Sequence, residues 1–263
     1  MLKKRLIPKL QMLTSKIGNY EQMVLVNTVK FKDYNEVGDP ISQAKIFQAQ
    51  FADELIFLDI DPQSKSTESL IEIVKKASSE IFMPITVGGG IGSYDYIREL
   101  TKNGADRVSI NSAGFKDPGF LKTSCEIFGK STIVASIDYK KDKKDGLYKV
   151  VIDSGKMLTN MGLLDWVKKV VDLGVGEILL TCIENDGSKE GIDLEIGEII
   201  SKMIPIPLVL SGGCGTANDF CEAFLKTNCE GVAAGNFFSY QDQNLMQTRA
   251  HIHNSNIPIR MHL

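Results

Sequence analysis

The chain has 263 residues, of which 43% are hydrophobic, and its formal net charge is −3. This length suits one large domain spanning 1–263, and the weak charge excludes the strongly basic surfaces that bind nucleic acid or anionic membranes. No run approaches the roughly 20 apolar residues that span a bilayer. The five cysteines are odd in number and lack metal-ligand spacing, so we expect a cytoplasmic protein without a metal or a cofactor.

From the N-terminus onward, short apolar runs rich in β-branched residues alternate with amphipathic stretches. The predicted strands are residues 5–10, 54–60, 84–88, 107–110, 132–138, 177–181, 207–211 and 231–234. The clearest predicted helices are residues 41–52, 67–81, 94–103 and 163–173. Eight strands that alternate with helices, without an edge strand, predict an α/β fold, a closed (β/α)8 TIM barrel. An open doubly wound sheet is the alternative, but no GxGxxG turn follows the first strand.

The two halves of the chain repeat the same glycine-rich pattern. Gly89 and Asn111 are 22 positions apart, as are Gly213 and Gly235. Each glycine cluster closes an apolar run, and Gly212 follows Gly89 at an offset of 123 positions. This constant offset predicts two equivalent half-barrels related by a pseudo-twofold axis.

Glycine-rich loops beside helix N-termini present bare backbone N–H groups that bind phosphate. The repeat therefore predicts two phosphate sites on opposite sides of the barrel mouth. The first would consist of Gly88, Gly89, Gly90, Asn111 and Ser112, and the second of Gly212, Gly213, Gly235 and Asn236. Two such sites point to a substrate with a phosphate at each end.

In a barrel of this kind the carboxyl ends of the strands form the active face. Further residues expected there are Gln11, Asp59, Asp138, Thr181, Asp186 and Gly187. Asp138 ends an apolar strand and is the strongest candidate for a general acid or base, although it could instead cap a loop or pair with Lys140. Asp59 could equally hold a loop, and Asp186-Gly187 could be only a turn.

Four charged residues begin predicted strands and therefore converge at the opposite, N-terminal face. They are Arg5, Glu54, Arg107 and Glu177. Two cations and two anions around the barrel axis would form a charged ring. From residue types alone, a stabilising network is the favoured interpretation of that ring.

Several segments in combination form a highly specific pattern that covers essentially the whole chain. They are residues 53–60, 87–91, 107–111, 176–181 with Asp186-Gly187, and 211–213. This pattern resembles the cyclase subunit of imidazole glycerol phosphate synthase. That resemblance implies a TIM barrel that receives ammonia from a glutaminase subunit on its N-terminal face and passes it along the axis to a bis-phosphorylated substrate. It also implies that the charged ring is an ammonia gate and that Asp106 faces the glutaminase.

The chain departs from this family in the first-strand half of the chemistry. The family uses two aspartates, at the ends of strands one and five, as acid and base. Asp138 matches the second, but Gln11 stands at the first, and an amide does not exchange a proton near neutral pH. Asn27 stands where a lysine is expected, and residues 12–24 are longer than the family's turn. Gln11 would therefore at most orient the substrate.

The segment 26–31, which leads to 38–40, is more similar to cyclase-like paralogues of bacterial surface-polysaccharide pathways. In those pathways a cyclase-like subunit, a glutaminase-like subunit and a third protein install an acetamidino group on a sugar. We therefore expect a variant for sugar amidination.

Three other functions stay open at this point. The chain could be a genuine histidine-pathway cyclase that makes imidazole glycerol phosphate and aminoimidazole carboxamide ribotide. It could be a non-catalytic binding subunit that activates a glutaminase. A related single-chain sugar-phosphate isomerase is the third alternative, but that enzyme needs no ammonia gate and relies on aspartates at both strand ends.

Overall fold

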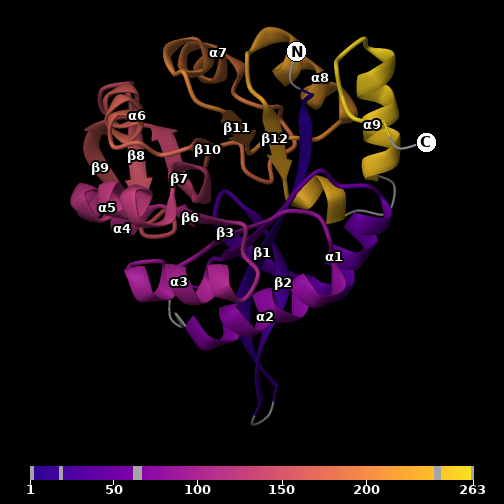
Figure 1. The fold of residues 1–263 in the computed structure, drawn as a ribbon. Coiled ribbons are helices and arrows are strands. Elements are labelled where there is room, and N and C mark those ends of the chain that lie inside the picture. The colour runs from indigo at the N-terminus through magenta and orange to yellow at the C-terminus, as the bar shows by residue number, and fades with distance from the viewer. Residues whose placement is uncertain (1–2, 18–19, 62–66, 240–243, 262–263) are drawn as a thin grey trace.

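The computed structural model describes residues 3–17, 20–61, 67–239 and 244–261, and its centre is a closed barrel of parallel strands (Figure 1). The barrel strands are β1 (Arg5–Ile17), β4 (Leu55–Asp59), β5 (Ile85–Gly88), β6 (Arg107–Ile110), β7 (Ile133–Lys141), β10 (Glu177–Cys182), β11 (Leu208–Ser211) and β12 (Gly231–Ala234). They run in the order β10-β11-β12-β1-β4-β5-β6-β7, and β7 pairs with β10 to close the circle. The predicted (β/α)8 barrel and its eight predicted strands are confirmed.

Helices surround the strands on all sides (Figure 1). They are α1 (Pro40–Ala49), α2 (Thr67–Glu80), α3 (Tyr94–Lys102), α4 (Ser112–Lys116), α5 (Pro118–Phe128), α6 (Leu163–Asp172), α7 (Leu194–Met203), α8 (Ala217–Lys226) and α9 (Leu245–Asn254). Local signals set their starts: the Asp39 side chain accepts a hydrogen bond from Ser42 N, and Pro40 occupies the first turn. Within the described residues, no helix is long and apolar enough to cross a membrane.

The apolar core has two parts, one between the strands and the helices and one on the barrel axis. The first includes Phe57, Ile97 and Trp166. The axial part consists of Ile7, Ile56, Val134, Leu179, Val209 and Ala233, with Leu58 packed against it. Because strand side chains alternate between the two faces of the sheet, the same strands fill both parts. The axial cluster separates the two ends of the barrel.

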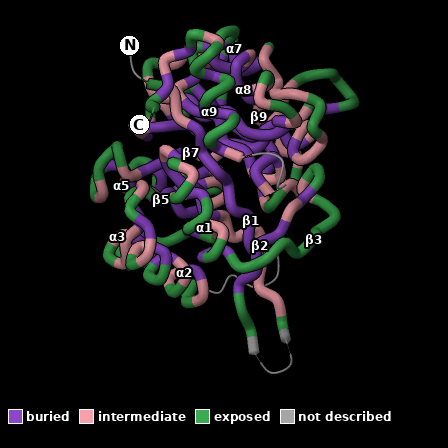
Figure 2. Tube along the Cα trace, turned by 90° about the vertical axis from the view of Figure 1, so that its right-hand side faces the viewer, coloured by how far each residue is buried: buried purple, intermediate pink, exposed green. Residues whose placement is uncertain are grey.

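The described residues of segment 12–24, which are 12–17 and 20–24, belong to an antiparallel ribbon rather than to a loop, and residues 18–19 lie outside the described part of the chain. β1 continues to Ile17 and pairs with β2 (Tyr20–Val29), which pairs with β3 (Lys32–Gly38). β7 likewise pairs with β8 (Tyr148–Ile152), which pairs with β9 (Met157–Gly162). The outer part of the β1–β2 hairpin projects from the body of the molecule as a largely exposed arm (Figure 2).

The internal repeat extends to the backbone of these two ribbons. Lys30 and Phe31, between β2 and β3, have φ values of 54° and 59°. Asp153 and Ser154, between β8 and β9, both have a φ of 54°. Two consecutive left-handed residues are the geometry of a tight hairpin turn, and here they recur at the 123-position offset of the glycine motifs. Each half-barrel therefore has an equivalent ribbon, as well as equivalent barrel strands.

Acidic residues at the N-terminal ends of the strands hold neighbouring strands together. Asp53 Oδ2 accepts a hydrogen bond from Leu6 N at 2.9 Å, and Asp106 Oδ2 accepts one from Ile85 N at 2.8 Å. Asp53 also forms a buried ion pair with Arg249 of α9 at 2.8 Å. Asp106 is exposed, and it binds the backbone of the neighbouring strand through Ile85 N.

Candidate active site

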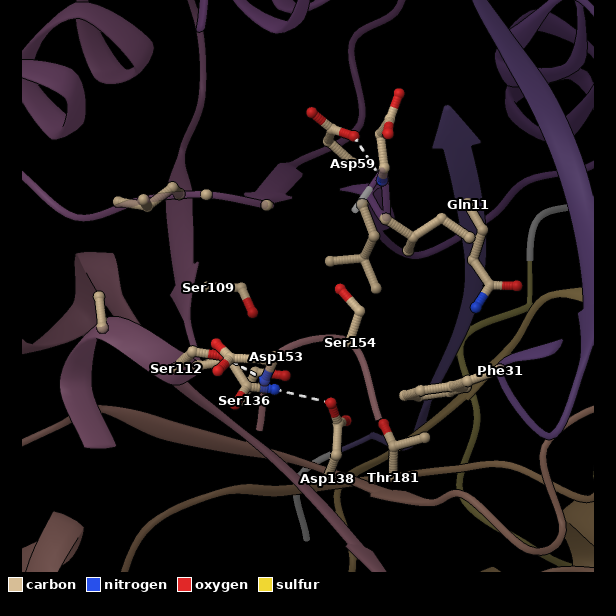
Figure 3. A pocket seen from close by; sticks show the side chains of 18 of the residues that line it. Gln11, Phe31, Asp59, Ser109, Ser112, Ser136, Asp138, Asp153, Ser154 and Thr181 are labelled. Atoms are coloured by element: carbon tan, nitrogen blue, oxygen red, sulfur yellow. Dashed lines mark hydrogen bonds between the residues drawn. The ribbon is translucent and has the colours of Figure 1, made fainter. Parts of the chain in front are cut away.

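A cavity of about 310 Å³ lies at the carboxyl ends of the barrel strands (Figure 3). Its predicted lining residues are Gln11, Asp59, Gly89, Gly90, Asn111, Ser112, Asp138 and Thr181. A smaller cavity of about 20 Å³ is lined by Gln11, Asp186, Gly187, Gly212, Gly213, Gly235 and Asn236. Gly88 lines neither of these cavities, because it lies within β5, where an added Cβ would be 2.6 Å from Leu58 Cδ2. All other predicted residues of the mouth contribute to one cavity or the other.

Asp138 has the environment of a group that exchanges protons near neutral pH. It lies on β7, is buried, and its Oδ2 accepts a hydrogen bond from Asn111 Nδ2 at 2.7 Å (Figure 3). Burial raises the pKa of Asp138 to about 7, because desolvation of the carboxylate outweighs the lowering effects of Lys9 and of the Asn111 hydrogen bond. A carboxyl group with a pKa close to the surrounding pH can act as an acid or as a base.

Gln11 lies on β1 and lines both cavities, with only 4% of the residue exposed. Its Oε1 lies 3.2 Å from Thr28 Oγ1, and Thr28 Oγ1 lies 3.4 Å from Asp186 Oδ1. Asn27, also on β2, accepts a hydrogen bond from Ser239 Oγ through its Oδ1 at 2.9 Å. The β2 strand therefore ties Gln11 to the region of the second glycine cluster.

Lys9 is a site residue that the sequence analysis missed. Its side chain is 2% exposed, lines the larger cavity, and donates from Nζ to Asp186 Oδ2 and to Ser211 Oγ, each at 2.9 Å. Strand alternation carries the signal that could have found it, since Lys9 and Gln11 are two positions apart on β1 and therefore share one face. Nothing in the sequence around Lys9 indicates that its partner is Asp186.

The first glycine cluster borders the larger cavity. Gly89 has a φ of +119°, and an added Cβ would be 2.5 Å from Asp59 O, so only glycine fits there. Asp59 Oδ1 accepts a hydrogen bond from Asp61 N at 2.9 Å, so its side chain holds the loop after β4. Asp59 also lines the larger cavity. Ser112 Oγ accepts from Asp153 N at 2.9 Å.

The second glycine cluster is packed tightly beneath the end of β2. An added Cβ on Gly187 would be 2.2 Å from Thr28 O, and Asn236 Nδ2 donates to the same oxygen at 2.7 Å. An added Cβ on Gly213 would be 1.9 Å from Gly191 O. The cavity beside this cluster, about 20 Å³, is much smaller than the one beside the first cluster, about 310 Å³.

The four charged residues at the N-terminal face do meet in a ring. Arg5 contacts Glu54 at 2.8 Å and Glu177 at 2.5 Å. Arg107 contacts Glu177 at 3.0 Å and Glu54 at 3.6 Å. The arginine side chains are 20% and 30% exposed, whereas the glutamates are 4% and 8% exposed. The ring is closed by these ion pairs, and the axial apolar cluster lies between it and the cavity.

Two further groups bear on the possible chemistry. Ser109 Oγ is buried, borders the larger cavity and has no hydrogen-bond partner among the described residues. Burial raises the pKa of Cys182 to about 11, which keeps this thiol protonated near neutral pH. The described residues contain no cluster of three or more His, Cys, Asp or Glu side chains suited to a metal ion.

Comparison with known proteins gives matches along nearly the whole chain. The family model described as "Histidine biosynthesis protein" matches residues 18–244. "Imidazole glycerol phosphate synthase subunit HisF" from Alkaliphilus metalliredigens (strain QYMF) is 37% identical over 260 residues, which cover 99% of this chain and 100% of the relative. The protein of the same name from Hydrogenobaculum sp. (strain Y04AAS1) is 37% identical over 261 residues, with 99% and 100% covered.

Proposed function

Because the chain belongs to the family of imidazole glycerol phosphate synthase subunits HisF, we propose that it is the ammonia-accepting subunit of a glutamine amidotransferase. Ammonia released by a glutaminase on the N-terminal face would travel through the barrel to a phosphorylated substrate in the larger cavity. The positions of the ring and of the cavity at opposite ends of one axis support this direction of transfer.

The ring of Arg5, Glu54, Arg107 and Glu177 would act as the gate. For transit an ion pair must open, and Arg107 has the longest contact, at 3.6 Å to Glu54, and the more exposed side chain. The axial apolar cluster above the ring favours neutral ammonia over ammonium, since burying an unpaired charge costs far more than burying a neutral polar molecule. The unpartnered Ser109 hydroxyl would then offer a hydrogen bond on the cavity side.

Asp138 would carry the proton transfer in the cavity. Its pKa of about 7 allows it to accept a proton from the incoming nitrogen and to return it to a leaving oxygen. Gln11 would orient the substrate by hydrogen bonds, and the Gly89-Gly90 loop with Ser112 would hold a phosphate group.

The observation that carries the choice of reaction is Gln11, an amide where the family's cyclisation uses a carboxylate. We propose that this chain serves a sugar amidination in a surface-polysaccharide pathway. The histidine-pathway cyclisation is the second candidate, favoured by the names of the relatives. A binding subunit without chemistry is disfavoured by the retained Asp138 with its raised pKa.

Complementation separates the first two candidates. A strain that lacks the histidine-pathway cyclase is given this chain and grown without histidine. We expect no growth, because the first-strand carboxylate is absent. Growth would assign the chain to the histidine pathway instead.

The Asp138→Asn variant separates catalysis from binding alone. In the complex with its glutaminase, we expect loss of the aminated product while glutamine hydrolysis is unchanged. The exposed Asp145, on the connection before β8, supplies the control variant Asp145→Asn, which should retain product formation. Unchanged product formation in Asp138→Asn would favour the binding subunit.

A further inference from the structure

We propose that Lys116, the last residue of α4, binds the phosphate group held at the first glycine cluster, and that Asp153 competes with that phosphate for the lysine. This inference rests on the proposed function and adds a cationic residue to one of its two phosphate sites. Three observations support it: the place of Lys116 on α4, the exposure of its ion pair with Asp153, and the excess of carboxyl groups around the larger cavity.

The first observation is the position of Lys116 relative to the phosphate site. Helix α4 begins at Ser112, a residue of that site, and ends at Lys116. Residues four positions apart lie on one face of a helix, so the Lys116 side chain extends beside the Ser112 hydroxyl. The helix also lies next to the glycine loop, since a Cβ added to Gly92 would be 3.8 Å from Ala113 Cβ. Ser112 and Lys116 both line the larger cavity, as does the first glycine cluster.

Asp153, the first residue of the turn between β8 and β9, contacts both of these α4 residues. Lys116 Nζ donates to Asp153 Oδ1 at 2.7 Å and to Oδ2 at 2.9 Å. The backbone N–H of Asp153 donates to Ser112 Oγ at 2.9 Å (Figure 3). Because Ser112 Oγ is the acceptor in this bond, its own O–H remains a donor for a phosphate oxygen. The turn therefore brings the serine donor and the lysine to the same side of the cavity.

The second observation is that the Lys116–Asp153 pair can open at little cost. Their side chains are 55% and 32% exposed, and an ion pair at such a position is screened by water and contributes little stability. Both hydrogen bonds of the ammonium group go to one carboxylate, so at least one of its three N–H donors remains for a ligand. Lys116 can thus turn toward a phosphate while the Asp153 carboxylate stays in contact with water.

The third observation is the balance of charge around the larger cavity. Its lining includes four carboxyl groups and two ammonium groups, which belong to Asp59, Asp61, Asp138, Asp153, Lys9 and Lys116. The Lys9 ammonium is buried and donates to Asp186 Oδ2 and Ser211 Oγ. Lys116 is therefore the lining cation that lies beside Ser112. A phosphate in this acidic surrounding needs a full positive charge as well as backbone N–H groups, and Lys116 supplies it.

The competing explanation is a brace, in which the pair only ties α4 to the turn between β8 and β9. A brace predicts that loss of either partner has the same effect on phosphate binding. Competition predicts opposite effects, because loss of Lys116 removes an attraction and loss of the Asp153 charge removes both a competitor and a repulsion. Asp153→Asn suits this test: the φ of 54° at this position is one that asparagine adopts, and the backbone N–H to Ser112 is kept.

The experiment is a titration of the full chain with inorganic phosphate, followed by backbone amide NMR. Shifts of the Gly89 and Gly90 amides report the first cluster, and those of Gly213 and Gly235 report the second, which serves as an internal control. The variants are Lys116→Met and Asp153→Asn.

The matched controls come from helix α5, where Lys122 and Glu126 form an exposed pair four positions apart. Neither residue lines the larger or the smaller cavity. Lys122→Met removes a lysine as Lys116→Met does, and Glu126→Gln removes a carboxylate as Asp153→Asn does.

We expect opposite changes at the first cluster. Lys116→Met should raise its dissociation constant for phosphate about fivefold or more, and Asp153→Asn should lower it about threefold, as for partly exposed charged hydrogen bonds. The two control variants should leave it unchanged, and all four should leave the response of the second cluster unchanged. The effect of Lys116→Met should shrink between about 50 mM and about 500 mM salt, because screening weakens the attraction.

Three outcomes would overturn the inference. In the first, the folded Lys116→Met variant binds phosphate at the first cluster as the wild type does. In the second, Lys116→Met and Asp153→Asn weaken binding equally, which assigns the pair the role of a brace. Both leave the proposed function intact, because phosphate still binds at the cluster. In the third, the Gly89 and Gly90 amides of the wild type do not respond to phosphate. Failure of the proposed function itself is recognised separately, by the absence of ammonia transfer in the glutaminase complex.

Discussion

The Phe31 ring packs closely against Gly155 beside the mouth of the barrel, since a Cβ added to Gly155 would lie 3.0 Å from Phe31 Cδ2. Phe31 belongs to the β2–β3 turn, and Gly155 to the turn between β8 and β9. The two equivalent ribbons of the half-barrels thus meet beside the larger cavity, which Phe31 and the neighbouring Ser154 both line (Figure 3). One wall of the cavity is therefore built from both halves of the repeat.

This contact predicts a specific loss of stability. Gly155→Ala should lower the free energy of unfolding by about 1 kcal/mol more than Gly146→Ala, because the new methyl group crowds the Phe31 ring. Both glycines have positive φ, +83° and +72°, but at Gly146 the nearest atom to an added Cβ is 4.0 Å away. Urea denaturation of the two variants gives the difference. Equal losses would mean that the ribbons do not press against each other.

The raised pKa of Asp138 predicts a stability that falls with increasing pH. The folded chain holds this proton up to a pKa of about 7, whereas the unfolded chain releases it near the ordinary aspartate pKa of 3.8. The free energy of unfolding should therefore decrease from about pH 4 to about pH 7 and be indifferent to this group outside that window. Asp138→Asn cannot titrate, so it should be more stable relative to wild type at pH 8 than at pH 5. Urea denaturation at both values tests this, and an unchanged difference would contradict the burial of an ionisable Asp138.

The charged ring predicts that Arg107 affects both the stability of the chain and its use of ammonia from glutamine. Arg107→Met should cost about 2 kcal/mol of unfolding free energy, since Glu54 and Glu177 would share Arg5 alone, and partial exposure of Arg107 limits the loss. Glutamine-dependent product formation should fall, while formation from added ammonium salt should persist. Arg98→Met breaks an exposed pair with Asp95 and should change neither. Equal loss of both activities would show that the ring does not gate ammonia.

Gln11 gives a prediction of gained function. Gln11→Asp should raise ammonia-dependent formation of imidazole glycerol phosphate at least about tenfold over the wild-type level, because general acid–base catalysis contributes about 10²–10⁴-fold. Gln11→Asn keeps an amide and should give no gain. A steady-state assay with ammonium salt compares the three chains. If Gln11→Asp gains nothing, the missing carboxylate is not what separates this chain from a cyclase.

The barrel strands could be predicted because each has a local apolar pattern and repeats at a fixed offset. The ribbon strand β3 lacks such a pattern. β3 is exposed along its whole length, so no alternation of apolar and polar residues marks it. Its place is fixed by pairing with β2, a contact that a single segment does not encode. Gly88 was predicted both to end the strand 84–88 and to bind phosphate, and in the structure it is the last, buried residue of β5 and lines neither cavity.

The sequence by itself determined the closed barrel, the two glycine clusters, the charged N-terminal ring and the position of Asp138, because each follows from local periodicity and from strand ends. Only the tertiary structure decided that Lys9 meets Asp186, that the cavity beside the second glycine cluster is much smaller than the one beside the first, and that the pKa of Asp138 lies near 7. The physical reason is that ion pairing, free volume and desolvation depend on residues far apart in the chain, which closure of the barrel brings together.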